Sequence, residues 1–210
     1  MKILYQGSPG AYSHLAALEV YPDAEIIPCK TFDECFSKAQ QDESLKIIIP
    51  ESNKTTGNIG IEYLIFKYRL NIYAEHFHKI EHNLLGLQGA KITDIKNVLS
   101  HAQGLSQCSN FIKKNNLIEN VRADTAGSAE LISKNQEISN AAIASKLSAK
   151  IYKLKIIASN IENEKGNTTR FLIMGNSIKQ PEFKNEKYIT SFLFKLKSKP
   201  AALYQSLGGF

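Results

Sequence analysis

The feature that most constrains the fold is an alternation of short apolar segments with amphipathic helical segments along most of the chain. Strands are predicted at residues 2–7, 25–29, 45–50, 70–80, 82–87, 97–100, 141–145 and 169–175. Helices are predicted between them at residues 13–20, 31–41, 59–67, 104–115, 126–134 and 145–152. This order is typical of an α/β architecture with mainly parallel sheets.

Length and composition indicate a globular protein. The 210 residues, 43% hydrophobic and 22% charged, suffice for one compact domain or for two lobes with a remnant. No apolar stretch approaches the roughly 20 residues that span a bilayer. The opening "MKILYQGSPG" has an apolar stretch too short for a secretory signal. We therefore expect a cytoplasmic protein without a membrane partner.

The charge pattern bears on possible partners. The formal net charge is +6, but the lysines are scattered singly or in pairs such as Lys113 and Lys114. Since no basic run is interleaved with aromatic residues, we expect no nucleic-acid partner. A basic balance also suits a small anionic substrate. The three cysteines, Cys29, Cys35 and Cys108, show neither a disulfide framework nor zinc-ligand spacing.

Polar segments mark several predicted junctions between strands and helices. Thr31 with Glu34 forms a capping-box pattern, and Asp124 or Thr125 is the expected N-cap of a later helix. Such junctions expose backbone N–H donors that favour anions. The polar junctions are "GSPGAYS", "PESNKTTG", "SHAQGLSQ" and "ADTAGS".

The C-terminal region is predicted to begin another domain. Segment 176–187 is polar and contains a proline, and we place the linker at 179–187. Residues 188–210 follow the pattern of a strand, a Lys-Pro turn and the opening of a helix. A lone strand and half a helix cannot bury a core, so we interpret this piece as the start of a larger domain.

Five segments resemble the prephenate dehydratase family, and they follow one another along the chain in the family's order. Members of this family remove water and carbon dioxide from prephenate to give phenylpyruvate in phenylalanine biosynthesis. The most specific is "NTTRFLIMG", which resembles the family's Thr-Arg-Phe signature. The others are "YQGSPGAYSHLAA" (5–17), "HAQGLSQC" (101–108), "DTAGSA" (124–129) and the tail "TSFLFKLKSKPAALYQSLGGF", which resembles the start of an ACT regulatory domain.

The resemblance implies two α/β lobes like those of type II periplasmic binding proteins, with the active site between them. The catalytic region would span 1–178, with lobe one at about 1–75 and 165–178 and lobe two at about 80–160. Residues 188–210 would be the first part of an α+β ACT domain. It further implies no cofactor, a homodimer or higher homo-oligomer, and phenylalanine as an effector only where a complete ACT domain is present.

By resemblance, Thr169 is the catalytic group, donating a hydrogen bond or a proton to the departing hydroxyl. A guanidinium matches a carboxylate, which makes Arg170 a candidate substrate contact. In a regular strand, however, Thr169 and Arg170 point to opposite faces. Two alternatives stay open: the backbone is irregular there, or Arg170 stabilises the site from behind.

The remaining candidate substrate contacts have weaker support. Asn167 and Thr168 are expected to orient the substrate or to fix their loop, and Phe171 is also explained as a core residue. Lys54 stands where the family has a serine if Asn53 is kept in register, and Ser52 then replaces a glutamate; sliding by one residue restores Glu51. The full set of expected contacts is Asn53, Lys54, Gln103, Thr125, Ser128, Asn167, Thr168, Arg170 and Phe171.

Three other interpretations are weighed. The altered loop at 50–57 suits a binding module without chemistry, and related enzymes would act on arogenate or only decarboxylate prephenate. Metal binding is the alternative for His76 and His78, which alternate onto one strand face. We expect no metal, because no carboxylate or cysteine in the pattern completes the site.

Overall fold

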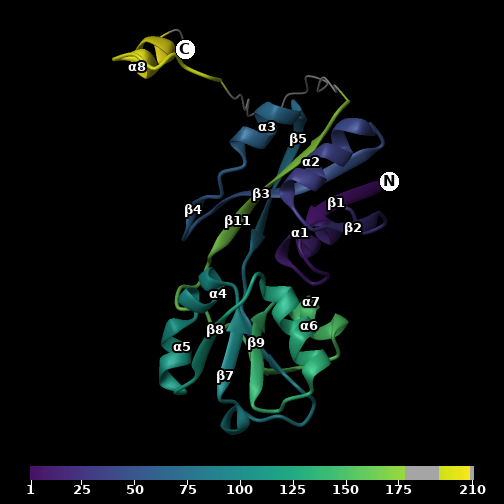
Figure 1. The fold of residues 1–210 in the computed structure, drawn as a ribbon, viewed down its shortest axis with the longest axis vertical. Helices are drawn as coiled ribbons and strands as arrows, with labels where there is room; N and C mark the ends of the chain where they lie inside the picture. The colour runs from purple at the N-terminus through teal and green to yellow at the C-terminus, as the bar shows by residue number, and fades with distance from the viewer. Residues whose placement is uncertain (178–193, 209–210) are drawn as a thin grey trace. The chain divides into compact units, whose positions relative to one another are not determined.

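The computed structural model describes residues 1–177 and 194–208 of the chain. By its internal contacts the chain divides into two compact units, Met1–Lys179 and Gln180–Phe210. The larger unit contains two sheets, each with helices packed on both faces, which we call lobe one and lobe two (Figure 1). The predicted α/β class and the two lobes are therefore confirmed.

Lobe one is built on a sheet with the strand order β2-β1-β3-β11-β5, and β4 pairs with β3. Strand β11, from the end of the larger unit, lies between the earlier strands β3 and β5, because the chain returns to lobe one after it has formed lobe two. The elements of this lobe are β1 (Lys2–Gln6), α1 (Tyr12–Val20), β2 (Glu25–Cys29), α2 (Phe32–Gln41), β3 (Leu45–Asn53), β4 (Gly57–Asn58), α3 (Glu62–Tyr68), β5 (Asn71–Lys79) and β11 (Thr168–Gly175).

Lobe two is built on a five-stranded sheet with the order β10-β6-β9-β7-β8. Its elements are β6 (Asn83–Gly86), the 3-10 helix η1 (Ile92–Asp94), β7 (Asn97–Ser100), α4 (Ala102–Gln107), α5 (Ser109–Lys114), β8 (Ile118–Val121), α6 (Thr125–Asn135), β9 (Asn140–Ala144), α7 (Lys146–Ile151) and β10 (Lys155–Ala158). The strands absent from the prediction, β4, β8 and β10, are short, and none of their residues is fully buried.

The prediction of mainly parallel sheets is wrong, because both sheets are mixed. Strand β11 runs antiparallel to β3 and to β5, and β6 runs antiparallel to β9 and to β10. Both β11 and β6 are the strands through which the chain enters a lobe from the other one. Each therefore enters its sheet from the edge at which the neighbouring strands end, and must run in the opposite direction.

Buried residues form cores on both faces of each sheet. In lobe one, Leu172 and Met174 belong to the cluster with Phe36 and Leu64, whereas Phe171 and Ile173 belong to the cluster on the α1 side. Because β11 is covered on both faces, it needs a nearly continuous apolar run rather than an alternating one. The sequence "FLIM" supplies that run.

The helix predicted at 104–115 is interrupted at Cys108, giving the shorter helices α4 and α5. The interruption coincides with contacts from Asn163. Its backbone N–H donates to the Gln107 carbonyl at 2.7 Å, and its Nδ2 donates to the Ser106 carbonyl at 3.2 Å. These carbonyls thus bond outside the helix, which no local sequence pattern indicates.

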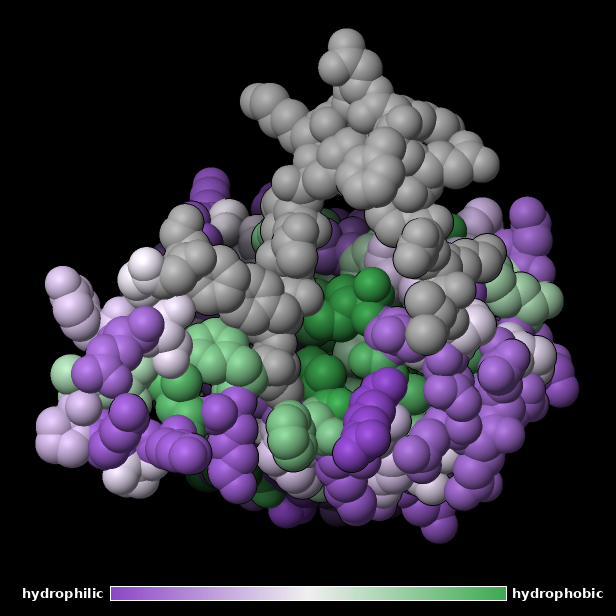
Figure 2. Space-filling model, turned by 90° about the horizontal axis from the view of Figure 1, so that it is seen from above, coloured by the Kyte–Doolittle hydropathy of each residue, from purple (hydrophilic) through white to green (hydrophobic). Residues whose placement is uncertain are grey.

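The last features concern the surface of the molecule, its helices and the smaller unit. In Figure 2 hydrophilic residues form most of the rim, and apolar residues gather near the middle of the face. No helix among the described residues combines the length and apolar character needed to cross a membrane. Of the predicted C-terminal elements, the half helix corresponds to α8 (Ala202–Leu207), while the linker at 179–187 and most of the predicted strand lie outside the described residues.

Candidate active site

The site region forms where the carboxyl edges of the two sheets face each other. In lobe one, β1, β3 and β5 end at the same edge, and β11 begins there. In lobe two, β7, β8 and β9 end at one edge, which is followed by the N-termini of α4, α6 and α7. Ligands of open α/β sheets bind outside such edges. The polar junctions singled out in the sequence lie at these two edges.

The loop after β1 joins the two edges directly. The Gly10 carbonyl accepts hydrogen bonds from the hydroxyls of Ser145 at 2.6 Å and Ser148 at 3.0 Å. Gly10 has a φ of +93°, and a Cβ there would lie 2.5 Å from the Ser148 oxygen, so only glycine fits. Ser8 donates to the carboxylate of Asp124, the N-cap of α6, at 3.4 Å. The motif "GSPG" is therefore explained as an interlobe contact.

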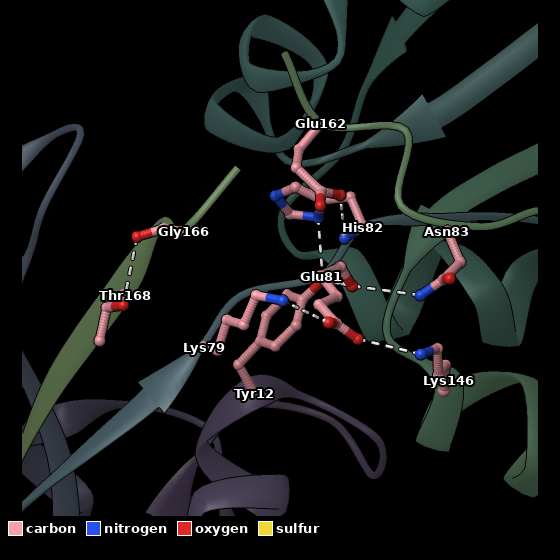
Figure 3. Close-up of polar contacts among 9 residues, drawn as sticks. All are labelled: Tyr12, Lys79, Glu81, His82, Asn83, Lys146, Glu162, Gly166 and Thr168. Atoms are coloured by element: carbon pink, nitrogen blue, oxygen red, sulfur yellow. Dashed lines mark hydrogen bonds and ion pairs between the residues drawn. The ribbon is translucent and has the colours of Figure 1, made fainter. Parts of the chain in front are cut away.

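Ion pairs stabilise the first of the two crossings between the lobes (Figure 3). Lys79 and Lys146 reach the carboxylate of Glu81 from opposite sides, each at 2.9 Å. The hydrogen bonds from Lys79 and Lys146 lower the pKa of Glu81 to about 2. Since Lys146 belongs to α7, this carboxylate links the crossing segment to lobe two.

A buried histidine connects both crossings. The Nδ1 of His82 lies 2.8 Å from the Tyr12 hydroxyl, and its Nε2 lies 2.8 Å from Gln107 Oε1. Its backbone N–H donates to the Glu162 carboxylate at 3.0 Å. Burial lowers the pKa of His82, so the ring is neutral at pH 7. Gln107, the last residue of α4, thus holds this histidine in place.

Thr169, the predicted catalytic residue, begins β11 and faces the same side of the sheet as Asn53 of β3. Its Oγ1 accepts a hydrogen bond from Asn53 Nδ2 at 2.8 Å. The Asn53 Oδ1 accepts from the backbone N–H groups of Thr55 at 3.0 Å and Thr56 at 3.2 Å. Because N–H groups only donate, they fix the orientation of the amide. The Thr169 oxygen thus accepts from Asn53, and among the described residues its own proton has no acceptor within hydrogen-bonding distance.

Arg170 points to the opposite face of β11. Its Nε donates to the Glu75 carboxylate at 2.7 Å and its Nη1 to the Glu51 carboxylate at 3.3 Å. Glu51 is the extra residue of a bulge, because Ser52 pairs with Arg170 while Pro50 pairs with Phe171. Of the two alternatives left open by the sequence, this geometry favours the one in which Arg170 stabilises the site from behind.

The neighbours of Thr169 have structural partners. Phe171 is 1% exposed and packs in the core, as the simpler interpretation of the sequence holds. The Thr168 hydroxyl donates to the Gly166 carbonyl at 3.3 Å, which supports a role in fixing the loop (Figure 3). Asn167 is buried, its carbonyl accepts from the Ile80 N–H, and its Oδ1 has no hydrogen-bond partner among the described residues.

The remaining predicted contacts, three in lobe two and Lys54 in lobe one, differ in whether their side chains are already bonded within the protein. Ser128 is buried, and its hydroxyl donates to the Asp124 carbonyl at 2.8 Å, so it has no donor left for a substrate. Thr125 opens α6 and is half-buried, and Gln103 is exposed in the first turn of α4. Lys54 is exposed next to Asn53, and its backbone N–H donates to the Thr168 carbonyl at 2.9 Å. Thr125, Gln103 and Lys54 remain available at the two edges.

The expectation that no carboxylate accompanies His76 and His78 is wrong. Glu19 of α1 places one carboxylate oxygen 2.8 Å from His76 Nε2 and 2.9 Å from His78 Nδ1. The sequence distance between residues 19 and 76 hid this contact, which arises because α1 packs on β5. The Tyr12–His82 contact was missed for the same reason.

Two facing α/β lobes with a polar site at their edges define a class of small-molecule enzymes and binding proteins. Within it, the prephenate dehydratase family profile matches residues 3–179, and the chain belongs to this family. It is 40% identical to arogenate dehydratase/prephenate dehydratase 1, chloroplastic, from Arabidopsis thaliana, covering all of this chain and 54% of the relative.

Two further comparisons are informative. The chain is 32% identical to a bifunctional N-acyl-homoserine lactone acylase/prephenate dehydratase from Komagataeibacter europaeus, covering 99% of this chain and 74% of that protein. A solved prephenate dehydratase from Arthrobacter aurescens, in complex with L-Phe, shares the fold with a TM-score of 0.87 at 21% identity, covering all of this chain and 72% of the other. The chain spans about half the length of the first curated relatives it matches.

Proposed function

We propose that this chain supplies the catalytic region of a prephenate dehydratase, which converts prephenate to phenylpyruvate with loss of water and carbon dioxide. Family membership supports the reaction class. The single observation that carries the proposal is the Thr169 hydroxyl, whose oxygen accepts from Asn53 and whose proton is left for a substrate. Only 6% of Thr169 is exposed, so only a small part of the residue is open to solvent.

In the proposed reaction, the bond between the ring and its hydroxyl breaks while the ring carboxylate leaves as carbon dioxide. The electron pair of the lost carboxylate enters the ring, which becomes aromatic and drives the reaction. Thr169 hydrogen-bonds to the departing oxygen and shares its proton, so the hydroxyl leaves as water. Thr169 is then reprotonated from solvent.

The substrate carries two carboxylates, which need positive partners. Lys54 beside Asn53 is the cation that we assign to one of them, replacing a hydroxyl contact by an ion pair. The Thr125 hydroxyl, together with the backbone N–H groups of the first turn of α6 that Asp124 does not bond, is the set of donors that we assign to the other. A carboxylate in place of Thr169 would repel this dianion, whereas a hydroxyl does not.

Arogenate is the second candidate substrate, because several relatives are named arogenate dehydratases. It has an amino group where prephenate has a ketone, so the product would be phenylalanine. A binding role without chemistry is the remaining alternative, and it rests on the altered loop at 50–57.

The test is to incubate the purified chain separately with prephenate and arogenate and to identify products by mass, with Thr169→Val in parallel. We expect phenylpyruvate from prephenate, reduced about 10²-fold or more in the variant. Formation of phenylalanine alone would assign arogenate. Calorimetric binding of prephenate by a folded protein without turnover would support the binding role and refute the proposal.

The finer assignments are also proposals. A homodimer or higher oligomer, a cytoplasmic location, an ACT domain that begins near residue 188, and phenylalanine as an effector of a protein with the complete domain all rest on family resemblance. Sedimentation of the purified chain tests the first of these. The effect of added phenylalanine on the rate of turnover tests the last of them.

A further inference from the structure

A second cluster of polar side chains lies between α1 and β5, outside the residues assigned to the reaction. It consists of Glu19, His76 and His78, and their ligand atoms all lie within 4.8 Å of one another. His76 and His78 are two residues apart on β5 and share the face covered by α1. Glu19 is the second-last residue of α1.

The three side chains converge on one point. The same Glu19 oxygen, Oε2, lies 2.8 Å from His76 Nε2 and 2.9 Å from His78 Nδ1. Tyr12, seven residues before Glu19 on α1, packs its ring 6.1 Å from that of His78. The helix and the strand therefore hold two imidazole nitrogens and a carboxylate oxygen toward a common centre.

We propose that Glu19, His76 and His78 form a binding site for a divalent transition-metal ion, with Zn²⁺ as the preferred occupant. Two imidazoles and one carboxylate are ligands of zinc sites that keep an open position. Imidazole nitrogen also disfavours Mg²⁺ and Ca²⁺, which take oxygen ligands.

The dimensions suit such an ion after a small adjustment. Bonds of about 2.0 Å in a tetrahedron separate ligand atoms by about 3.3 Å. The ion must therefore push the carboxylate slightly away from both rings and bring the two imidazole nitrogens, which lie within 4.8 Å of each other, to that spacing. The side chain of Glu19 is 47% exposed and that of His76 25%, which permits this movement and leaves a path for entry. The ion replaces the protons that the imidazoles share with Glu19, so binding weakens at low pH.

The electrostatics agree with this assignment. Burial acts to raise the pKa of Glu19, but hydrogen bonds from His78 and His76 outweigh it and lower that pKa. The carboxylate is thus ionised at neutral pH. The three cysteines are buried and do not compete as ligands.

The site borders the candidate active site without being part of it. His78 is the cross-strand partner of Thr169, and His76 is that of Phe171. A bound ion would tie α1 to β5, the strand that supports β11. This proposal does not depend on the proposed reaction, because its test measures the metal itself.

The experiment is titration of untagged, chelator-treated protein with Zn²⁺ by calorimetry, together with the visible spectrum of the Co²⁺ form. We expect one equivalent per chain and the intense absorption of a tetrahedral Co²⁺ site. The variants Glu19→Gln and His76→Gln should bind at least about tenfold more weakly. The control His101→Gln, at a histidine outside the cluster, should bind like the parent.

Three results would overturn the proposal: no stoichiometric binding, unchanged affinity in both cluster variants, or an equal loss in His101→Gln. Circular dichroism establishes whether each variant is folded. If a cluster variant does not fold, NMR of the parent chain decides, since Co²⁺ must shift the His76 and His78 resonances far more than those of His101.

Discussion

The two faces of strand β11 differ in chemistry although they belong to adjacent residues. On one face Thr169 takes part in a chain of neutral hydrogen bonds through Asn53 to the backbone at Thr55 and Thr56. On the other face Arg170 is held between two carboxylates, Glu75 and Glu51. A signature of consecutive residues thus combines the proposed catalytic group on one side with a stabilising group on the other, because strand side chains alternate.

The largest effect should come from removing the Thr169 hydroxyl. Thr169→Val keeps the shape of the side chain, so we expect kcat to fall about 10²-fold or more. The melting temperature should change little, since only the hydrogen bond to Asn53 is lost. Rate measurement and thermal unfolding on the same preparation check both parts. If the activity of Thr169→Val falls only in proportion to the fraction of unfolded protein, the proposed difference in role between the two faces of β11 is wrong.

Arg170→Met should have the opposite profile. It leaves Glu51 and Glu75 without their shared counter-charge, which we expect to reduce the free energy of unfolding by about 2 kcal/mol. Activity per folded molecule should stay near that of the parent, because Arg170 faces away from Thr169. Urea unfolding and steady-state kinetics measure the two quantities. A large rise in KM at unchanged stability would show that Arg170 binds the substrate after all.

Asn53→Asp tests the face of Thr169 more finely. The carboxylate keeps acceptors for the N–H groups of Thr55 and Thr56 but cannot donate to Thr169. We expect kcat to fall about tenfold, with the loop intact. A variant with the parent's rate would mean that the Asn53 donor does not prepare the hydroxyl.

His82, in the crossing between the lobes, belongs to neither face and should affect stability rather than chemistry. Burial lowers the pKa of His82 in the folded protein. The stability that the neutral ring contributes is therefore fully present above the unfolded pKa of about 6.5, and it is lost as the pH falls through the lower folded pKa. Unfolding of the parent should become easier as the pH falls below about 6.5. His14, whose pKa burial also lowers, adds a slope of the same sign.

The measurement is therefore the difference between the parent and His82→Gln, which should unfold with a shallower dependence on pH. Identical slopes in the two proteins would contradict the assignment of a neutral, buried ring.

Much of the fold was predictable because local patterns determine it. The apolar run 169–175 and the N-caps at Thr31 and Asp124 are local signals, and all correspond to observed elements. The strand directions were not predictable, since they depend on the edge at which the chain enters each lobe. The break at Cys108 depends on Asn163, which is distant in sequence.

Part of the candidate site was also predictable from the sequence, but the partners of its side chains were not. Alternation along β11 raised the question of Arg170, but only the structure identifies Glu51 and Glu75 as its partners. Ser128 was a reasonable candidate at a helix start, yet its hydroxyl bonds within its own helix. Glu19 reaches His76 only through packing of α1 on β5, which leaves no pattern in the sequence.

The most direct test of the central claim is a double-mutant cycle of Asn53→Asp and Thr169→Val, with kcat measured for prephenate. If Asn53 acts through the Thr169 oxygen, its substitution should lower kcat no further once the hydroxyl is gone, and the two effects on kcat will not add. The charge that Asn53→Asp introduces repels the dianionic substrate in both backgrounds, which raises KM and not kcat. If the double variant loses the product of the two single factors, Asn53 and Thr169 act independently, and the account of this face of β11 is wrong.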